Sequence, residues 1–213
     1  MVLKLKICGM REPDNIAGVA DLQPDYMGFI FYPGSKRYVA DLQPAVLEEL
    51  PKSVKPTGVF VNEDPDTVIR LAKTYKLAAL QLHGSESPDY CRKIKEALPD
   101  TEVVKAFGVN NEFKFSDLTE FNEVVDYFLF DTQTESHGGS GKVFDWRLLA
   151  NYTGNKPYFL SGGIGIEQAE ALNSINDNRL YAIDINSRFE LEPGLKDLER
   201  LKEFKKTLSG AAR

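Results

Sequence analysis

The sequence predicts a closed (β/α)8 TIM barrel, in which eight parallel strands are surrounded by outer helices. Eight short apolar runs recur along the chain, and helix signals occupy the segments between them. Strands that alternate with helices form a parallel sheet with right-handed crossovers. The chain has 213 residues, whereas a typical barrel of this kind has about 250. We therefore expect a single domain, residues 1–213, with little decoration around the barrel.

The predicted strands are the eight apolar runs, which span residues 2–9, 26–31, 55–61, 78–84, 102–109, 127–132, 157–163 and 180–187. An open doubly wound sheet is the alternative arrangement. It would place a glycine-rich G-x-G-x-x-G loop directly after the first strand. The chain reads CGMREPDN at that point and lacks this pattern, so the closed barrel is the better prediction.

The connecting segments carry helix signals. Asp64-Pro65 and Ser87-Pro88 each combine a favoured N-cap residue with a proline in the first helical turn. The segment that starts near Asp145 predicts only a short helix. The longest connection, 132–144, follows the sixth strand and is a candidate lid. Apolar residues at three- and four-residue steps predict an amphipathic last helix, whose face consists of Leu195, Leu198, Leu201, Phe204 and Leu208.

Composition limits the classes of function. A net charge of −6 and a pI of about 5.1 argue against a nucleic-acid partner. No apolar run approaches the roughly 20 residues that span a bilayer, and the N-terminus does not resemble a secretory signal. We therefore expect no membrane association and a cytoplasmic, reducing location. The chain's two cysteines provide neither a disulfide framework nor a metal-binding CxxC pair.

Polar side chains converge at the predicted C-terminal ends of four strands. Because side chains alternate along a strand, Cys8 points to the barrel axis with Lys6 one layer below it. Taken singly, such residues have structural explanations, as core cysteines, hydrogen-bonded histidines or turn-forming aspartates. Their convergence on the face where barrels place active sites favours a functional role. The same alternation brings to this rim the side chains of His83, Asp131, Asp184 and Asn186.

Two further features complete the predicted site. Glycines cluster in HGGSG (137–141), within the candidate lid, and in SGGIG (161–165), at the end of strand seven. Loops after strands seven and eight, with exposed backbone N–H groups, commonly bind phosphate in such barrels. Cys91, in contrast, shares a predicted helix face with Ile94 and Leu98, and we interpret it as a structural residue.

Five motifs resemble those of the phosphoribosylanthranilate isomerase family, in order and over nearly the whole chain. They are KICGMRE, SKRYV, LQLHG, GGSGKVFDW and LSGGI. The resemblance implies an Amadori rearrangement in tryptophan biosynthesis, with a small phosphoribosyl substrate and without a cofactor or metal. It leaves open whether the protein is a monomer or a homodimer.

The resemblance also implies residue roles. Cys8 matches the general base and Asp131 the general acid. Arg37 matches the residue that pairs with the anthranilate carboxylate, a planar partner suited to a guanidinium. The sugar would be lined by His83, Asp184 and Asn186. The phosphate would be held by Gly139, Gly141, Gly162, Gly163, Ile164, Ser187 and Arg188.

The chain departs from the family pattern at Arg188, where glycine is common, and at Ser140, where threonine is frequent. Arg188 would be mildly strained if that position required a positive φ. Two other functions stay open: an isomerase of a related phosphoribosyl aminoaldose, and a phosphosugar-binding barrel without catalytic activity. A metal-dependent epimerase would need more histidines than the two present.

Overall fold

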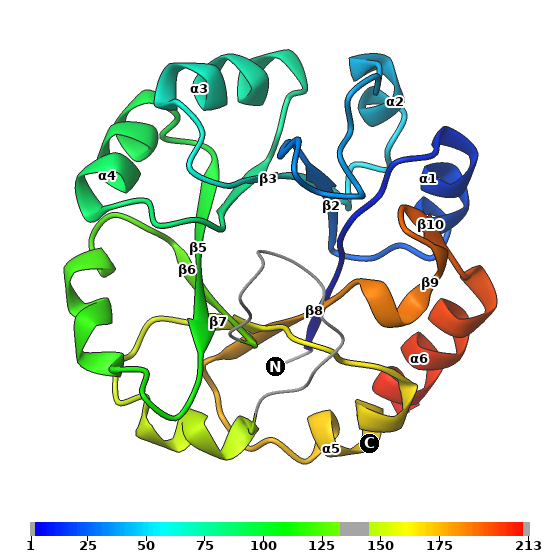
Figure 1. The fold of residues 1–213 in the computed structure, drawn as a ribbon. Helices are drawn as coiled ribbons and strands as arrows, with labels where there is room; N and C mark the ends of the chain where they lie inside the picture. The colour runs from blue at the N-terminus through cyan, green and yellow to red at the C-terminus, as the bar shows by residue number, and fades with distance from the viewer. Residues whose placement is uncertain (1–2, 133–144, 211–213) are drawn as a thin grey trace.

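The computed structural model describes residues 3–132 and 145–210 and confirms the predicted barrel. Eight strands pair in parallel in sequence order, and β8 pairs with β1 to close the cylinder (Figure 1). The strands are β1 (Lys4–Ile7), β2 (Tyr26–Ile30), β3 (Lys55–Phe60), β4 (Ala79–Leu82), β5 (Glu102–Val109), β6 (Tyr127–Thr132), β7 (Tyr158–Leu160) and β8 (Leu180–Ile185). The lid predicted at 132–144 lies outside the described residues, except for Thr132 at the end of β6.

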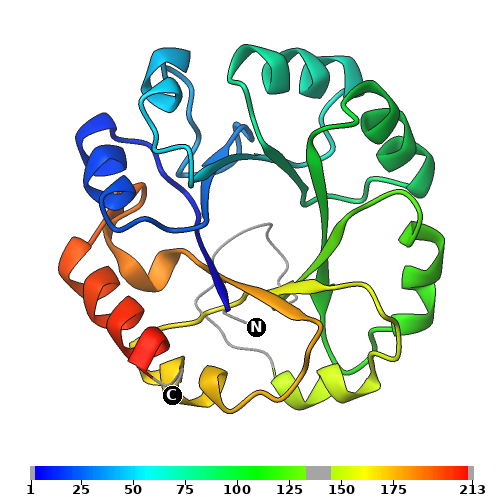
Figure 2. The same cartoon turned by 180° about the vertical axis from the view of Figure 1, so that it is seen from behind.

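Helices surround the barrel, as the view from behind shows most simply (Figure 2). The α-helices are α1 (Pro13–Ala20), α2 (Pro44–Glu48), α3 (Pro65–Thr74), α4 (Pro88–Ala97), α5 (Ala169–Asn173) and α6 (Leu198–Gly210). Short 3-10 helices supplement them: η1 (Phe115–Phe121), η2 (Trp146–Asn151), η3 (Ile166–Gln168) and η4 (Ser187–Phe189). The short helix expected near Asp145 is thus η2, and it follows β6.

The two predicted helix starts are confirmed. The Asp64 carboxylate accepts a hydrogen bond from the Thr67 N–H, and the Ser87 hydroxyl accepts one from the Tyr90 N–H. Both side chains satisfy a backbone donor that the first turn of a helix leaves unpaired. A proline follows each cap. These contacts explain why α3 and α4 begin where the sequence predicted.

The predicted last helix is wrong at its start. Leu195 lies not in the helix but in β10 (Leu195–Lys196), which pairs with β9 (Glu190–Glu192) in a small antiparallel hairpin. The chain reverses at Gly194, whose φ of +92° suits glycine. The helix α6 then begins at Leu198, and its predicted apolar residues Leu201 and Phe204 are buried.

Two apolar layers support the barrel. The larger one fills the space between the strands and the helices and includes Leu5 and Ile7 of β1. The smaller one lies among strand residues of alternate parity, including Leu129, Phe159 and Ala182. Polar residues take over further along several strands, where Lys6, Gln81 and Asp184 are buried. No helix among the described residues has the length and apolar character needed to cross a membrane.

Candidate active site

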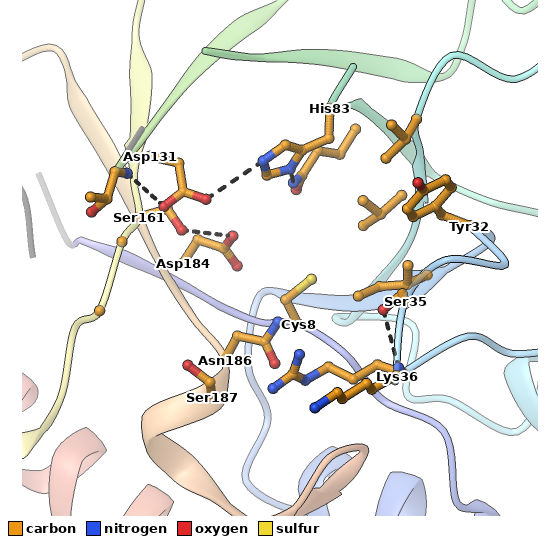
Figure 3. A pocket seen from close by; sticks show the side chains of 18 of the residues that line it. Cys8, Tyr32, Ser35, Lys36, His83, Asp131, Ser161, Asp184, Asn186 and Ser187 are labelled. Atoms are coloured by element: carbon orange, nitrogen blue, oxygen red, sulfur yellow. Dashed lines mark hydrogen bonds and ion pairs between the residues drawn. The ribbon is translucent and has the colours of Figure 1, made fainter. Parts of the chain in front are cut away.

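A pocket of about 460 Å³ opens at the C-terminal ends of the strands (Figure 3). The structure brings together there all the predicted site residues that it describes. Cys8 and Asp131 lie on different sides of the pocket, with Asp184 between them in the view of Figure 3. The pocket is lined by Cys8, Arg37, His83, Asp131, Gly162, Gly163, Ile164, Asp184, Asn186, Ser187 and Arg188, among others. Gly139, Gly141 and His137 lie outside the described residues.

Cys8 follows β1 directly, and its backbone N–H donates to the carbonyl of Ile185 at 2.9 Å. The thiol has room because β2 carries Gly28 beside it: a Cβ there would lie 2.7 Å from Sγ. Burial raises the pKa of the Cys8 thiol above its ordinary value, although the ammonium of Lys6 acts in the opposite direction. The thiol is therefore protonated at neutral pH in the unliganded protein.

A buried ion pair lies below the thiol. Lys6 of β1 and Asp184 of β8 are directly opposite in the strand register, and Nζ lies 2.8 Å from Oδ1. Their side chains are 2% and 5% exposed. The second carboxylate oxygen of Asp184 accepts from the hydroxyl of Ser161 at 3.4 Å. Burial raises the pKa of Asp184, and Lys6 opposes that rise.

Asp131 is held on another side of the pocket by the backbone N–H of the next residue and by a histidine. Its Oδ1 accepts from the Thr132 N–H at 2.7 Å, and its Oδ2 lies 3.5 Å from Nε2 of His83. The Nε2 of Gln81 lies 2.6 Å from Nδ1 of His83. Because an amide nitrogen only donates, Nδ1 is the acceptor, and the ring proton is on the nitrogen that faces Asp131.

Arg37 lies at the mouth of the pocket, in the loop after β2. Its guanidinium makes a bidentate pair with Glu190, with Nε 2.8 Å from Oε1 and Nη2 2.6 Å from Oε2. The predicted contact of Arg37 with a ligand carboxylate stays a prediction. The partner on the protein side, Glu190, was missing from the sequence-based site.

The loops after β7 and β8 form the other part of the pocket. Gly162 and Gly163 have positive φ values of +95° and +64°, and a Cβ on Gly162 would lie 2.3 Å from Thr132 Oγ1. Arg188 is not among the residues with positive φ, so its backbone carries no such strain. Its Nη1 lies 3.7 Å from the Glu167 carboxylate, and Arg188 lines the same pocket as the two glycines.

The residues around this pocket that escaped the sequence-based site include Gln81, Glu190 and Lys196. Gln81 lies two residues before His83, so the two side chains share the inner face of their strand. The Oε1 of Gln81 is buried and has no hydrogen-bond partner among the described residues. Within residues 3–132 and 145–210, no group of three or more His, Cys, Asp or Glu side chains is arranged to hold a metal ion.

Comparisons with known proteins point to one family. Residues 5–207 match the family described as PRAI: N-(5'phosphoribosyl)anthranilate (PRA) isomerase. The N-(5'-phosphoribosyl)anthranilate isomerase of Parabacteroides distasonis is 47% identical over 204 residues, which cover 94% of this chain and 90% of that protein.

Solved structures agree. A phosphoribosyl anthranilate isomerase from Thermus thermophilus aligns with a TM-score of 0.86 at 27% identity, over 98% of this chain and 99% of that one. A phosphoribosyl anthranilate isomerase in complex with reduced 1-(o-carboxyphenylamino)-1-deoxyribulose 5-phosphate aligns with a TM-score of 0.82 at 34% identity, over the same shares of the two chains. Monomers generated from the dimeric Thermotoga maritima enzyme align with a TM-score of 0.78 at 33% identity, again over 98% of this chain and 99% of that one.

Proposed function

Since this chain belongs to the N-(5'-phosphoribosyl)anthranilate isomerase family, we propose that it converts N-(5-phosphoribosyl)anthranilate to 1-(2-carboxyphenylamino)-1-deoxyribulose 5-phosphate, a step of tryptophan biosynthesis. The observation that carries the proposal is the placement of a thiol and a carboxyl group on different sides of one pocket. An aldose-to-ketose shift needs one proton delivered and another removed, so an acid and a base must both reach the sugar.

Asp131 acts as the acid in this proposal. Its carboxyl group gives a proton to the furanose ring oxygen, the bond from that oxygen to C1' breaks, and the nitrogen lone pair forms a C1'=N iminium. His83, whose Nε2–H faces the same carboxylate, holds it in place and donates to the sugar or to Asp131. Gln81 fixes this tautomer of the histidine.

Cys8 acts as the base. Its thiolate removes the proton from C2', the electrons of that bond form C1'=C2', and the iminium nitrogen becomes neutral. The resulting enaminol then tautomerises to the ketose. Burial favours the neutral thiol, so Cys8 must first release its proton to water; the thiolate that remains is stabilised by the nearby cationic iminium and by Lys6 below it.

The remaining pocket residues hold the two ends of the substrate. Arg37 pairs with the anthranilate carboxylate at the mouth. The backbone N–H groups of Gly162, Gly163 and Ser187 and the cation of Arg188 bind the phosphate. Positive φ values at the two glycines let the main chain approach an anion closely. Asp184 and Asn186 line the ribose.

The test is a fluorescence assay on substrate made in situ, since the aminobenzoate ring of the substrate fluoresces. Cys8→Ser and Asp131→Asn should each abolish turnover while still binding the reduced product analogue. Cys91→Ser is the matched control, because this second cysteine is buried within α4 and should leave turnover unchanged. Near-full activity in either site variant would refute the assigned roles.

The two other functions are tested in the same experiment. A phosphosugar-binding barrel without catalytic activity would bind the product analogue but leave the fluorescence constant. An isomerase of a related phosphoribosyl aminoaldose would act on that compound in a parallel assay. The cytoplasmic location and the choice between monomer and homodimer stay predictions.

A further inference from the structure

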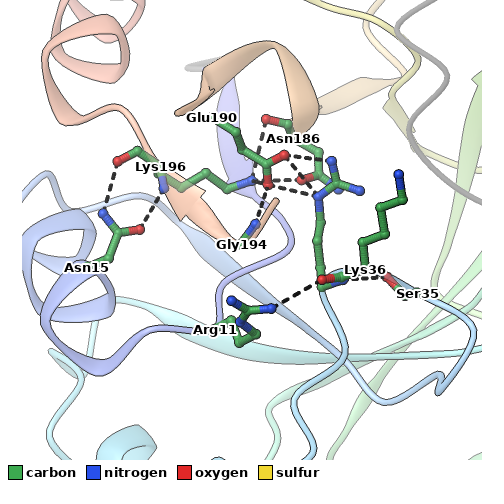
Figure 4. A network of polar contacts seen from close by, with 9 residues as sticks. Arg11, Asn15, Ser35, Lys36, Asn186, Glu190, Gly194 and Lys196 are labelled. Atoms are coloured by element: carbon green, nitrogen blue, oxygen red, sulfur yellow. Dashed lines mark hydrogen bonds and ion pairs between the residues drawn. The ribbon is translucent and has the colours of Figure 1, made fainter. Parts of the chain in front are cut away.

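We propose that Glu190 and Lys196, neither of which lines the pocket, are positioning residues that set the direction of Arg37 and the amide orientation of Asn186. Both belong to the hairpin of β9 and β10, which the barrel itself does not require. The inference rests on the proposed function, because it assigns Arg37 to the ligand's carboxylate. Figure 4 shows the network around Glu190, Lys196 and Asn186.

Glu190 determines which edge of Arg37 a ligand can reach. Its carboxylate is 4% exposed and accepts Nε of Arg37 at 2.8 Å and 3.0 Å and Nη2 at 2.6 Å. A guanidinium offers two edges for bidentate pairing, and Glu190 occupies the Nε–Nη2 edge. Nη1 makes no hydrogen bond within the described residues. The Nη1–Nη2 edge therefore remains for a carboxylate in the pocket that Arg37 lines.

Lys196 determines which end of the Asn186 amide faces the ligand. Its ammonium is completely buried and lies 2.7 Å from Asn186 Oδ1 and 2.7 Å from Glu190 Oε1. An ammonium has donors only, so the amide must turn its oxygen toward Lys196 and its NH₂ away from it. Asn186 lines the pocket and so presents a hydrogen-bond donor to the ribose.

The hairpin is fixed in place by a residue of α1 and by a contact across its own turn. Asn15 of α1 donates to the Lys196 carbonyl at 2.9 Å and accepts from its N–H at 2.8 Å. Gly194 in the hairpin turn donates to Glu190 Oε1 at 3.2 Å. Because Asn15 bonds both backbone groups of Lys196, the buried lysine is held where its ammonium can orient other groups.

Gly9 makes the close approach of the oriented pair feasible. It follows Cys8 and has a φ of +78°. A Cβ at this position would lie 2.6 Å from Arg37 Cδ and 2.6 Å from Asn186 Oδ1. The two side chains that the network orients therefore meet over the residue next to the thiol.

The network also carries charge. Arg37 contributes a positive charge and Glu190 a negative one; Lys196 adds a second positive charge when protonated, and burial lowers the pKa of its ammonium while Glu190 opposes that effect. The other charged groups that act on the thiol are Lys6, which favours the thiolate, and Asp184, which opposes it; Lys196 favours the thiolate as well. Removal of Lys196 should therefore make the thiol harder to ionise.

The test measures binding of two ligands: the reduced product analogue, and the same compound without its carboxyl group. Glu190→Gln should weaken binding of the first by about 10- to 100-fold, the range for one charged hydrogen bond, and change binding of the second by less than about 3-fold. The matched control is Asp177→Asn, which breaks another bidentate pair, with Arg179, outside the pocket. This control should leave the affinity for both ligands unchanged.

Equal losses for both ligands, or no loss, would overturn the positioning role. Glu190→Asp covers the case in which the glutamine variant does not fold: it keeps the charge, retracts the carboxylate by one methylene and should produce the same selective loss. Because binding is measured without turnover, a wild-type protein that lacks isomerase activity would refute the proposed function alone.

A second measurement addresses Lys196. In a Cys91→Ser background, Cys8 is the only thiol, since the chain has two cysteines. Lys196→Gln should shift the alkylation of Cys8 by iodoacetamide to higher pH, whereas Lys196→Arg should restore the wild-type profile. An unchanged profile in the glutamine variant would overturn the electrostatic effect of Lys196 on the thiol.

Discussion

Replacement of Lys6 by methionine should be one of the most damaging single substitutions at the bottom of the pocket. The ammonium is 2.8 Å from Asp184 Oδ1, and both side chains are buried. Removal of one partner leaves a buried carboxylate unpaired, which costs about 3–5 kcal/mol. Domain stabilities are about 5–15 kcal/mol, so the Lys6→Met variant loses a large share of its free energy of unfolding.

The same strand provides a matched control. Lys4 also pairs with an aspartate at 2.7 Å, but Lys4 and Asp25 are 42% and 32% exposed. Exposed ion pairs contribute about 0–1 kcal/mol. Lys4→Met should therefore lower the free energy of unfolding by less than about 1 kcal/mol.

The Lys6→Met variant should also respond to pH in a defined direction. Burial already raises the pKa of Asp184, and Lys6 opposes that rise, so without Lys6 the carboxyl pKa rises further. A raised pKa in the folded state means that the folded protein binds the extra proton. The contribution of this carboxyl group to the free energy of unfolding is then fully present below its unfolded pKa of about 3.9 and is lost as pH rises through its folded pKa. The variant should therefore be more stable, relative to wild type, at about pH 5 than at about pH 7.

Urea unfolding followed by circular dichroism measures both quantities. Wild type, Lys6→Met and Lys4→Met are compared at the two pH values. A loss in Lys6→Met no larger than that of the control, or a loss that does not shrink at lower pH, would refute the reasoning about the buried pair.

Three further predictions concern the pocket. Because burial raises its pKa, Cys8 should react slowly with iodoacetamide at neutral pH, with a midpoint above the ordinary value of 9.0; a midpoint at or below that value would contradict this. Gly162→Ala should destabilise the protein by about 1–3 kcal/mol and raise KM, because the new Cβ would lie 2.3 Å from Thr132 Oγ1. An unchanged unfolding temperature in calorimetry together with an unchanged KM would contradict this. Gln81→Leu removes the hydrogen bond that holds His83 and should lower kcat by up to about 10-fold, the effect of one lost hydrogen bond; turnover equal to wild type would contradict this.

Much of the barrel was predictable because it follows from local patterns. Strand alternation placed Cys8 and Lys6 on the inner side, and the cap-plus-proline pairs marked two helix starts. These patterns depend on residues that are near one another in the sequence. The same kind of reasoning assigned Leu195 to the last helix. The three-residue spacing from Leu195 to Leu198 fits a helix face, although in the structure Leu195 belongs to the hairpin that precedes the helix. The proline and glycine at 193–194 were the available turn signal.

The polar network behind Arg37 was not predictable in the same way. Its contact with Glu190 joins residues 153 positions apart, and the contact of Asn15 with Lys196 spans 181. No periodicity in the sequence reports such distances. Arg37 was expected to be available to a ligand, and only the fold reveals that one of its edges is already occupied by Glu190.

The pairing of β1 with β8 sets a condition on when this protein can work. Lys6 and Asp184 face each other across the line where the two extremes of the chain meet, and Cys8 and Asn186 lie just above. During synthesis, the residues from β8 and from the hairpin after it therefore cannot pack around the thiol until both segments have left the ribosome. Fragments split between the two halves should be inert separately and should gain activity only on reassociation.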